Sequence, residues 1–168
     1  TARDLKIVRT VERLNQIIHA STLTSRFVSM FYGELEIGGL FIYVNAGHPA
    51  PFHLRATGEI TRLHEGGPIL GPLPAANYDR GFVRLRPGDV LVIYTDGVTE
   101  TRDDAGASED DLGEEYGVER LIEVTREHQH RTAEEILDAV FEDVRAFSGG
   151  APTEDDRTAI VIRCPPGD

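Results

Sequence analysis

Residues 26–44 read RFVSMFYGELEIGGLFIYV, and this stretch decides the fold class. It begins with a nearly continuous apolar run, and residues 34–37 then alternate polar and apolar, which is typical of a strand that leaves the core toward solvent. The Gly38-Gly39 pair predicts a tight turn, and residues 40–44 are rich in β-branched and aromatic side chains. The stretch therefore predicts a β-hairpin and antiparallel pairing.

The chain on the C-terminal side of this hairpin continues the antiparallel pattern. Turn signals separate strand-like runs twice more, so that two further hairpins are predicted, and a β-branched run near the end predicts a last strand. These elements are 51–55 with 59–64 around Gly58, 82–86 with 90–94 around Pro87-Gly88-Asp89, and the strand 158–163. Residues 65–76 contain three Gly and three Pro and are expected to be irregular.

Helical spacing appears on both sides of this strand-rich region. Residues 4–20 place apolar side chains on one face, and two further helices are predicted at 118–127 and 133–147, the second with Thr132 and Glu135 in capping-box spacing. The apolar face of the first helix comprises Ile7, Val11, Leu14 and Ile18. Residues 101–115 are strongly acidic and predict a mobile surface loop. Together these elements predict an α+β fold.

Length and composition indicate a single folded domain. The chain has 168 residues, of which 40% are hydrophobic and 27% charged, which suffices for a core without disulfides. Twenty-nine acidic and 17 basic residues give a net charge of −12, which argues against nucleic acid and anionic membranes as partners.

Cysteine content and hydropathy favour a cytoplasmic protein. Cys164 is the single cysteine and cannot form an internal disulfide, which fits a reducing compartment. No apolar run approaches the roughly 20 residues of a membrane-spanning helix, and no signal-peptide pattern opens the chain. Because the chain begins at Thr1 without an initiator Met or a leader, we expect it to be part of something longer; the alternative is removal of a Met that preceded Thr1.

Residues 94–100, YTDGVTE, are the most informative segment for function. Here a core strand runs into an Asp-Gly pair, where the carboxylate of Asp96 can face a hard cation such as Mg²⁺ or Mn²⁺ and Gly97 allows close backbone approach. The alternative is an Asx turn without a ligand, which an Asp-Gly pair alone favours.

Two further segments carry candidate site residues. Asp155 and Asp156 precede the last predicted strand, and if that strand lies beside residues 90–94, Asp96 and Asp155 come together as half of a metal site. The alternative is a solvated acidic turn. In residues 45–51, NAGHPAP, Asn45 and His48 interrupt a strand, and His48 is either a proton donor or a hydrogen-bonded loop residue.

Five blocks occur in the order and spacing of a known family: FVSMFY, NAGHPAP, GPILG, YTDGVTE and DDRT. On these blocks the chain resembles the SpoIIE-like branch of the PPM-type, metal-dependent serine/threonine protein phosphatases. The resemblance covers nearly the whole chain and implies a sandwich of two antiparallel sheets flanked by helices, in α-β-β-α layers.

The resemblance also implies a chemistry and partners. The family binds two Mn²⁺ or Mg²⁺ ions through aspartates and hydrolyses phosphoserine or phosphothreonine on proteins. By motif, Asp96 and Asp155 are then the metal ligands, Gly97 is a close-approach position and Asp156 a supporting acid. The implied partners are a phosphorylated protein, such as an anti-sigma-factor antagonist in bacterial signalling, and an upstream sensor domain.

The sequence departs from the family at its beginning. The family's first metal-binding blocks, an acidic Gly-Asp strand and an Asp-Val-Ser-Gly-His-Gly type turn, have no counterpart here, which predicts an incomplete domain with weak activity on its own. A second interpretation is therefore a non-catalytic domain of the same fold that binds a partner through its acidic loop and an exposed sheet edge.

Overall fold

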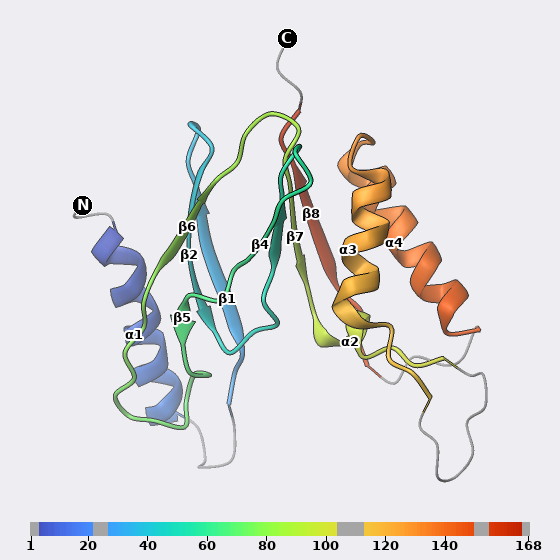
Figure 1. The fold of residues 1–168 in the computed structure, drawn as a ribbon. Helices are drawn as coiled ribbons and strands as arrows, with labels where there is room; N and C mark the ends of the chain where they lie inside the picture. The colour runs from blue at the N-terminus through green and yellow to red at the C-terminus, as the bar shows by residue number, and fades with distance from the viewer. Residues whose placement is uncertain (1–3, 22–26, 104–112, 150–154, 166–168) are drawn as a thin grey trace. The chain divides into compact units, whose positions relative to one another are not determined.

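The computed structural model describes residues 4–21, 27–103, 113–149 and 155–165. The chain divides into two compact units, residues 1–50 with 62–85 and residues 51–61 with 86–168, and each is described by itself. Helices and strands are labelled in Figure 1. Within the described ranges, no helix is both long enough and apolar enough to cross a membrane.

The first unit is a sheet with one helix packed on it (Figure 1). The hairpin predicted around Gly38-Gly39 is confirmed, because β1 (Met30–Leu35) pairs antiparallel with β2 (Leu40–Ala46). On the other side of β2 lie β6 (Gly81–Arg84), which is antiparallel, and the two-residue strand β5 (Gly66–Gly67), which is parallel.

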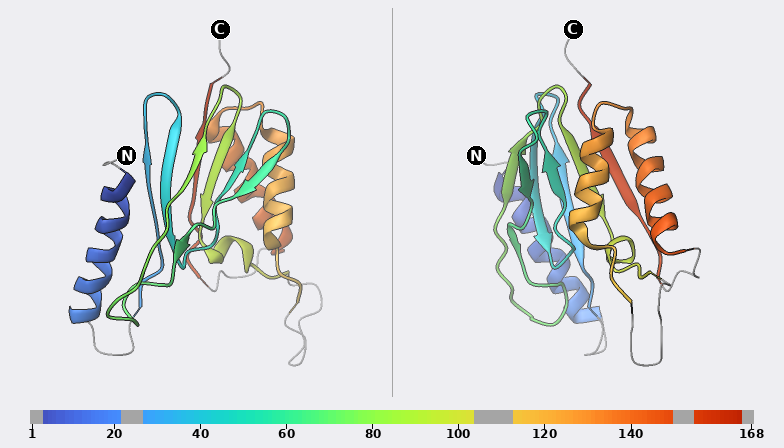
Figure 2. Two further views of the ribbon diagram at one scale, coloured as in Figure 1. Left: turned by 60° about the vertical axis from the view of Figure 1, so that its left-hand side comes forward. Right: turned by 45° about the vertical axis from the view of Figure 1, so that its right-hand side comes forward.

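Helix α1 (Asp4–Ser21) covers one face of this sheet, as Figure 2 shows. Ile7 and Val11 are buried as predicted, whereas Leu14 is only half-buried. The fully buried neighbour is Asn15, whose amide accepts a hydrogen bond from the Gly71 N–H and donates one to the Leu73 carbonyl, both at 2.9 Å. These two bonds explain how a polar residue replaces an apolar one on the buried face.

The second unit combines a four-stranded sheet with a helical hairpin (Figure 2, right). Its strand order is β4-β3-β7-β8, with β3 and β8 both antiparallel to β7. The strands are β3 (Phe52–Leu54), β4 (Ile60–Arg62), β7 (Val90–Tyr94) and β8 (Ala159–Arg163). The second hairpin and the last strand are thus confirmed. The helices are α3 (Gly117–His128) and α4 (Ala133–Phe147), and the predicted capping box at Thr132 and Glu135 is present.

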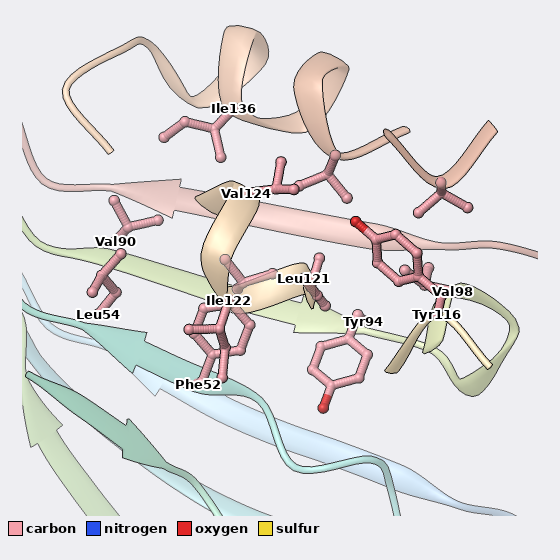
Figure 3. Close-up of a cluster of buried hydrophobic side chains, with 13 residues drawn as sticks. Phe52, Leu54, Val90, Tyr94, Val98, Tyr116, Leu121, Ile122, Val124 and Ile136 are labelled. Carbon is pink, nitrogen blue, oxygen red and sulfur yellow. The ribbon is translucent and has the colours of Figure 1, made fainter. Parts of the chain in front are cut away.

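The core of the second unit joins this sheet to the two helices (Figure 3). Phe52, Val90 and Val92 contribute from the strands, and Leu121 and Ile136 from the helices; all five are fully buried. Leu137 and Phe141, on the same helix as Ile136, are half-buried. Tyr94 at the end of β7 belongs to this core, and Ala159 at the start of β8 packs against it.

The third predicted hairpin is wrong. Strand β6 pairs with β2, whereas β7 pairs with β3 and β8, so the two strands joined by Pro87-Gly88-Asp89 belong to different sheets. The Asp89 N–H donates to the Arg86 carbonyl at 2.9 Å, and Gly88 has φ +88° after Pro87, which are the features of a type II turn. Type II turns splay the flanking strands, since tight hairpins need the mirror-image types.

The predicted acidic loop at residues 101–115 is described only at its two ends, and residues 104–112 lie outside the described residues. At those ends the chain is paired and partly buried, so the surface loop is shorter than predicted, and its mobility stays a prediction. Arg102 and Glu115 form a β-bridge and an ion pair at 2.5 Å, and Thr101 is 6% exposed. This pairing was not predicted from the sequence, because it joins residues more than ten positions apart.

Asp89 is a buried carboxylate that accepts hydrogen bonds from two backbone N–H groups and one imidazole. Its Oδ1 accepts a hydrogen bond from the Ala56 N–H, and its Oδ2 accepts bonds from the Arg86 N–H and His53 Nε2–H, each at 2.9 Å. Burial by itself would raise the pKa of Asp89, but these donors favour the carboxylate and hold its pKa below the ordinary 3.8.

We expect Asp89→Asn to destabilise the protein by roughly 2–4 kcal/mol. All three partners of the carboxylate donate hydrogen bonds, so the NH₂ group of the asparagine would face a donor and leave it without an acceptor. Because folding lowers the pKa of Asp89, its carboxylate adds to the free energy of unfolding at pH values above the pKa it has in the unfolded chain. This added stability is lost as the pH falls through the pKa of the folded protein. Urea unfolding between pH 3 and pH 7 measures both effects. An Asp89→Asn protein as stable as the variant of exposed Asp79, Asp79→Asn, would contradict the assigned network.

Candidate functional site

The Asp96 segment begins where β7 leaves the core. Strand β7 ends at Tyr94, and Asp96 opens the single-turn helix α2 (Asp96–Thr99), which the sequence did not predict. The Asp96 side chain is exposed, and its Oδ1 accepts a hydrogen bond from the Gly97 N–H at 3.0 Å. This local bond is the kind that the Asx-turn interpretation of Asp96 predicts. It occupies only one of the two carboxylate oxygens.

The Asp155 segment has the same local arrangement at the start of β8. Asp155 and Asp156 are exposed, and Asp155 Oδ1 accepts a hydrogen bond from the Asp156 N–H at 2.7 Å. For both Asp96 and Asp155, the second carboxylate oxygen has no hydrogen-bond partner in the part of the chain that the structure describes. Each acid therefore presents an oxygen of the kind that hard cations prefer.

Thr95 joins the two segments through backbone and side chain. Its N–H donates to the Thr158 carbonyl at 3.0 Å, and its Oγ1 accepts the Thr158 N–H at 3.0 Å while donating to the Asp156 carbonyl at 3.2 Å. Sequence analysis missed this role. Because β7 and β8 are antiparallel neighbours, the residue after one strand faces the residue before the other.

Gly97 lies directly against the backbone of the second segment. A Cβ atom built on Gly97 would lie 2.5 Å from the Asp156 carbonyl oxygen and 3.0 Å from its carbon, far inside van der Waals contact. Gly97 is buried, and no φ in the left-handed region is involved, so space rather than backbone conformation requires glycine here. The Asp96-Gly97 and Asp155-Asp156 segments are therefore packed together at one sheet edge.

These residues fit part of a metal site. Carboxylate and backbone oxygens are the ligands that Mg²⁺ and Mn²⁺ prefer, and the packed segments bring such groups together. Among the described residues, however, no group of three or more His, Cys, Asp or Glu side chains is arranged to hold a metal ion. Metal binding by Asp96 and Asp155, with Asp156 in support, stays a prediction.

Asn45 and His48 belong to the first unit, where Asn45 has a clear local role. Asn45 is 5% exposed; its Oδ1 accepts the His48 N–H at 2.8 Å, and its Nδ2 donates to the His48 and Leu63 carbonyls. The amide is thus occupied in holding the turn. His48 is half-buried, its ring lies against Phe31, and its Nδ1–H donates to the Pro49 carbonyl at 2.8 Å.

Comparison with known families and proteins identifies related sequences. The family model of Stage II sporulation protein E (SpoIIE) matches residues 1–165. Protein IcfG of Synechocystis sp. is 33% identical over 138 residues, which are 81% of this chain and 20% of that protein. Phosphoserine phosphatase RsbU of Bacillus subtilis is 28% identical over 155 residues, covering 91% of this chain and 44% of RsbU. The chain thus spans less than half the length of either relative.

Solved structures share the fold. The PP2C domain of SiaA from Pseudomonas aeruginosa superposes with a TM-score of 0.70 at 18% identity, covering 96% of this chain and 65% of that one. The manganese-presoaked phosphatase domain of SpoIIE from Bacillus subtilis gives 0.61 at 18% identity, covering 98% and 67%. The expected PPM-type α+β fold is thereby confirmed.

Proposed function

From the premise that this chain belongs to the SpoIIE family, we propose that the protein carrying it is a metal-dependent phosphoprotein phosphatase. Family membership agrees with the resemblance drawn from the five sequence blocks. In this proposal the chain forms the C-terminal portion of a single phosphatase domain, and its substrate is phosphoserine or phosphothreonine on another protein.

The observation that carries the proposal is the packing of the Asp96-Gly97 segment against the Asp155-Asp156 segment. Asp96 and Asp155 would hold divalent cations through their outward carboxylate oxygens, and Gly97 permits the close approach of the two backbones. When bound, Mn²⁺ or Mg²⁺ ions, two in a complete domain, activate water and neutralise charge on the phosphoryl group. The chain's own contribution is to place these carboxylates next to the neighbouring ends of β7 and β8.

The finer identity of the substrate rests on the relatives. RsbU is named a phosphoserine phosphatase, and a solved neighbour from Mycobacterium tuberculosis combines RsbU and RsbW domains. We propose a phosphorylated anti-sigma-factor antagonist as the substrate, control by an upstream sensor domain, and action in the cytoplasm. The net charge of −12 supports a protein rather than nucleic acid as partner.

The test is hydrolysis by the full-length protein of a phosphoserine peptide and of a phosphorylated anti-sigma-factor antagonist. We expect release of phosphate with Mn²⁺, loss of release after chelation with EDTA, and recovery when Mn²⁺ is restored. The antagonist should be hydrolysed faster than the peptide. Turnover indifferent to chelation would contradict metal dependence, and binding of a partner without any turnover would favour the non-catalytic interpretation.

A further inference from the structure

Thr101 connects helix α2 to a paired segment that the proposed function does not use. Its hydroxyl donates to the Gly97 carbonyl at 2.9 Å, and its own carbonyl accepts the Tyr116 N–H at 2.7 Å. Thr101 is 6% exposed, so both bonds are shielded from water. Gly97 is the residue that follows Asp96, so Thr101 touches the segment that presents a proposed ligand.

Tyr116 anchors this connection to α4. It is 3% exposed, its hydroxyl donates to Asp143 Oδ2 at 2.7 Å, and its ring packs edge-on against Phe147 with centroids 5.4 Å apart (Figure 3 shows Tyr116 within the core). Burial, and then the bond to Asp143, raise the pKa of Tyr116, so the phenol keeps its proton and donates. Arg120 lies 3.5 Å from the same carboxylate oxygen.

Residues 101–103 and 113–116 form a paired stem between α2 and α3. The Asp103 N–H donates to the Glu114 carbonyl at 3.1 Å, Asp103 Oδ1 accepts the Glu114 N–H at 2.8 Å, and the Arg102–Glu115 ion pair closes the same ladder. Thr101 and Tyr116 end this stem on the side of the core. The stem thus holds Thr101 in a defined position relative to α4.

Helix α2 needs such support. It has four residues, and its N-cap residue Thr95 makes no side-chain capping bond. A single helical turn is unstable by itself, because nucleation costs more than one turn of hydrogen bonds returns. Asp96 therefore lies between two supports: Thr95 before it bonds to Thr158 and Asp156, and the Thr101 hydroxyl bonds to the carbonyl of Gly97, the residue after it.

We propose that Thr101 is a positioning residue that fixes α2, and with it Asp96, for metal binding, and that Tyr116 ties Thr101 to α4. The inference rests on the proposed function, since it takes Asp96 as a metal ligand. It assigns a role to a threonine and a tyrosine outside the acidic motifs.

The test compares two threonines with the same local chemistry. Thr125 is fully buried, and its hydroxyl donates to the Leu121 carbonyl at 2.8 Å, four residues earlier, as Thr101 does to Gly97. Thr101→Val and Thr125→Val each keep the side-chain shape and remove one such bond. Mn²⁺ binding to the full-length protein is measured by titration calorimetry, and stability by thermal unfolding.

We expect Thr101→Val to bind Mn²⁺ about fivefold more weakly, the equivalent of one typical hydrogen bond, while Thr125→Val lowers only the melting temperature. Thr101→Ser retains the hydroxyl and should recover most of the affinity. Equal Mn²⁺ affinity in Thr101→Val and Thr125→Val would overturn the proposal.

Two further variants separate the possible failures. Asp96→Asn should lose Mn²⁺ binding; if it binds as the unmodified protein does, the ligand assignment is wrong and this inference falls with it. If Asp96→Asn fails to bind but Thr101→Val binds normally, only the positioning role is wrong. Should Thr101→Val not fold, Tyr116→Phe replaces it, with an expected loss of about threefold. Unchanged affinity in Tyr116→Phe would then overturn the proposal.

Discussion

Asp96→Asn is expected to lower the Mn²⁺-dependent phosphatase rate of the full-length protein by about 100-fold or more. The substitution preserves the size of the side chain and removes its negative charge. An uncharged amide is a poorer ligand for a hard cation, and it can turn its NH₂ group toward the ion. The measurement is kcat and kcat/KM with a phosphoserine peptide over a range of Mn²⁺ concentrations.

The matched control is Asp138→Asn. Asp138 is exposed on α4 and belongs to neither acidic segment, so the same change of charge there should leave the rate unchanged. Asp155→Asn should resemble Asp96→Asn, because the two segments are packed together. A rate that Asp96→Asn leaves unchanged, with turnover still sensitive to EDTA, would remove Asp96 from the proposed ligands.

Local sequence signals predicted most of the elements correctly. The Gly38-Gly39 turn with its apolar flanks predicted the β1-β2 hairpin, and Thr132 with Glu135 predicted the start of α4, because both features depend on neighbouring residues. The pairing of β6 with β2 depends instead on how the Pro87-Gly88 turn directs the chain. The residues of β6 have the same tendency to form a strand whether the partner is β2 or β7. The sequence therefore favoured pairing with β7, which is nearer along the chain, and this prediction was wrong.

The packing of the two acidic segments at one sheet edge was also predictable from the sequence, whereas their role as metal ligands stays a prediction. Acids at the end of one strand and the start of another indicate a shared sheet edge, provided that the strands are neighbours, and β7 and β8 are. The supporting residues were not predictable, because Thr95 and Thr101 act through backbone carbonyls at positions set by tertiary packing. Buried Asn15 and the His53–Asp89 pair were missed for the same reason.

Gly97→Ala is expected to reduce Mn²⁺ affinity and phosphatase rate at least tenfold and to destabilise the protein by about 1–3 kcal/mol. Within a helix, alanine is favoured over glycine by up to about 1 kcal/mol, so helix propensity alone predicts the opposite sign for stability. The added methyl group would lie 2.5 Å from the Asp156 carbonyl oxygen. That atom belongs to the backbone and cannot rotate away, so one of the two acidic segments must move.

Gly38→Ala provides the control for this substitution. A Cβ atom at Gly38 would have Arg84 Nη1 as its nearest neighbour, at 3.9 Å, so the same methyl group meets no obstacle there. We expect Gly38→Ala to retain the Mn²⁺ affinity and the phosphatase rate, as measured by calorimetry and peptide hydrolysis. If Gly97→Ala behaved like Gly38→Ala in both measurements, close packing of the Asp96 and Asp155 segments would not be required for activity. The site would then have to be sought away from this sheet edge.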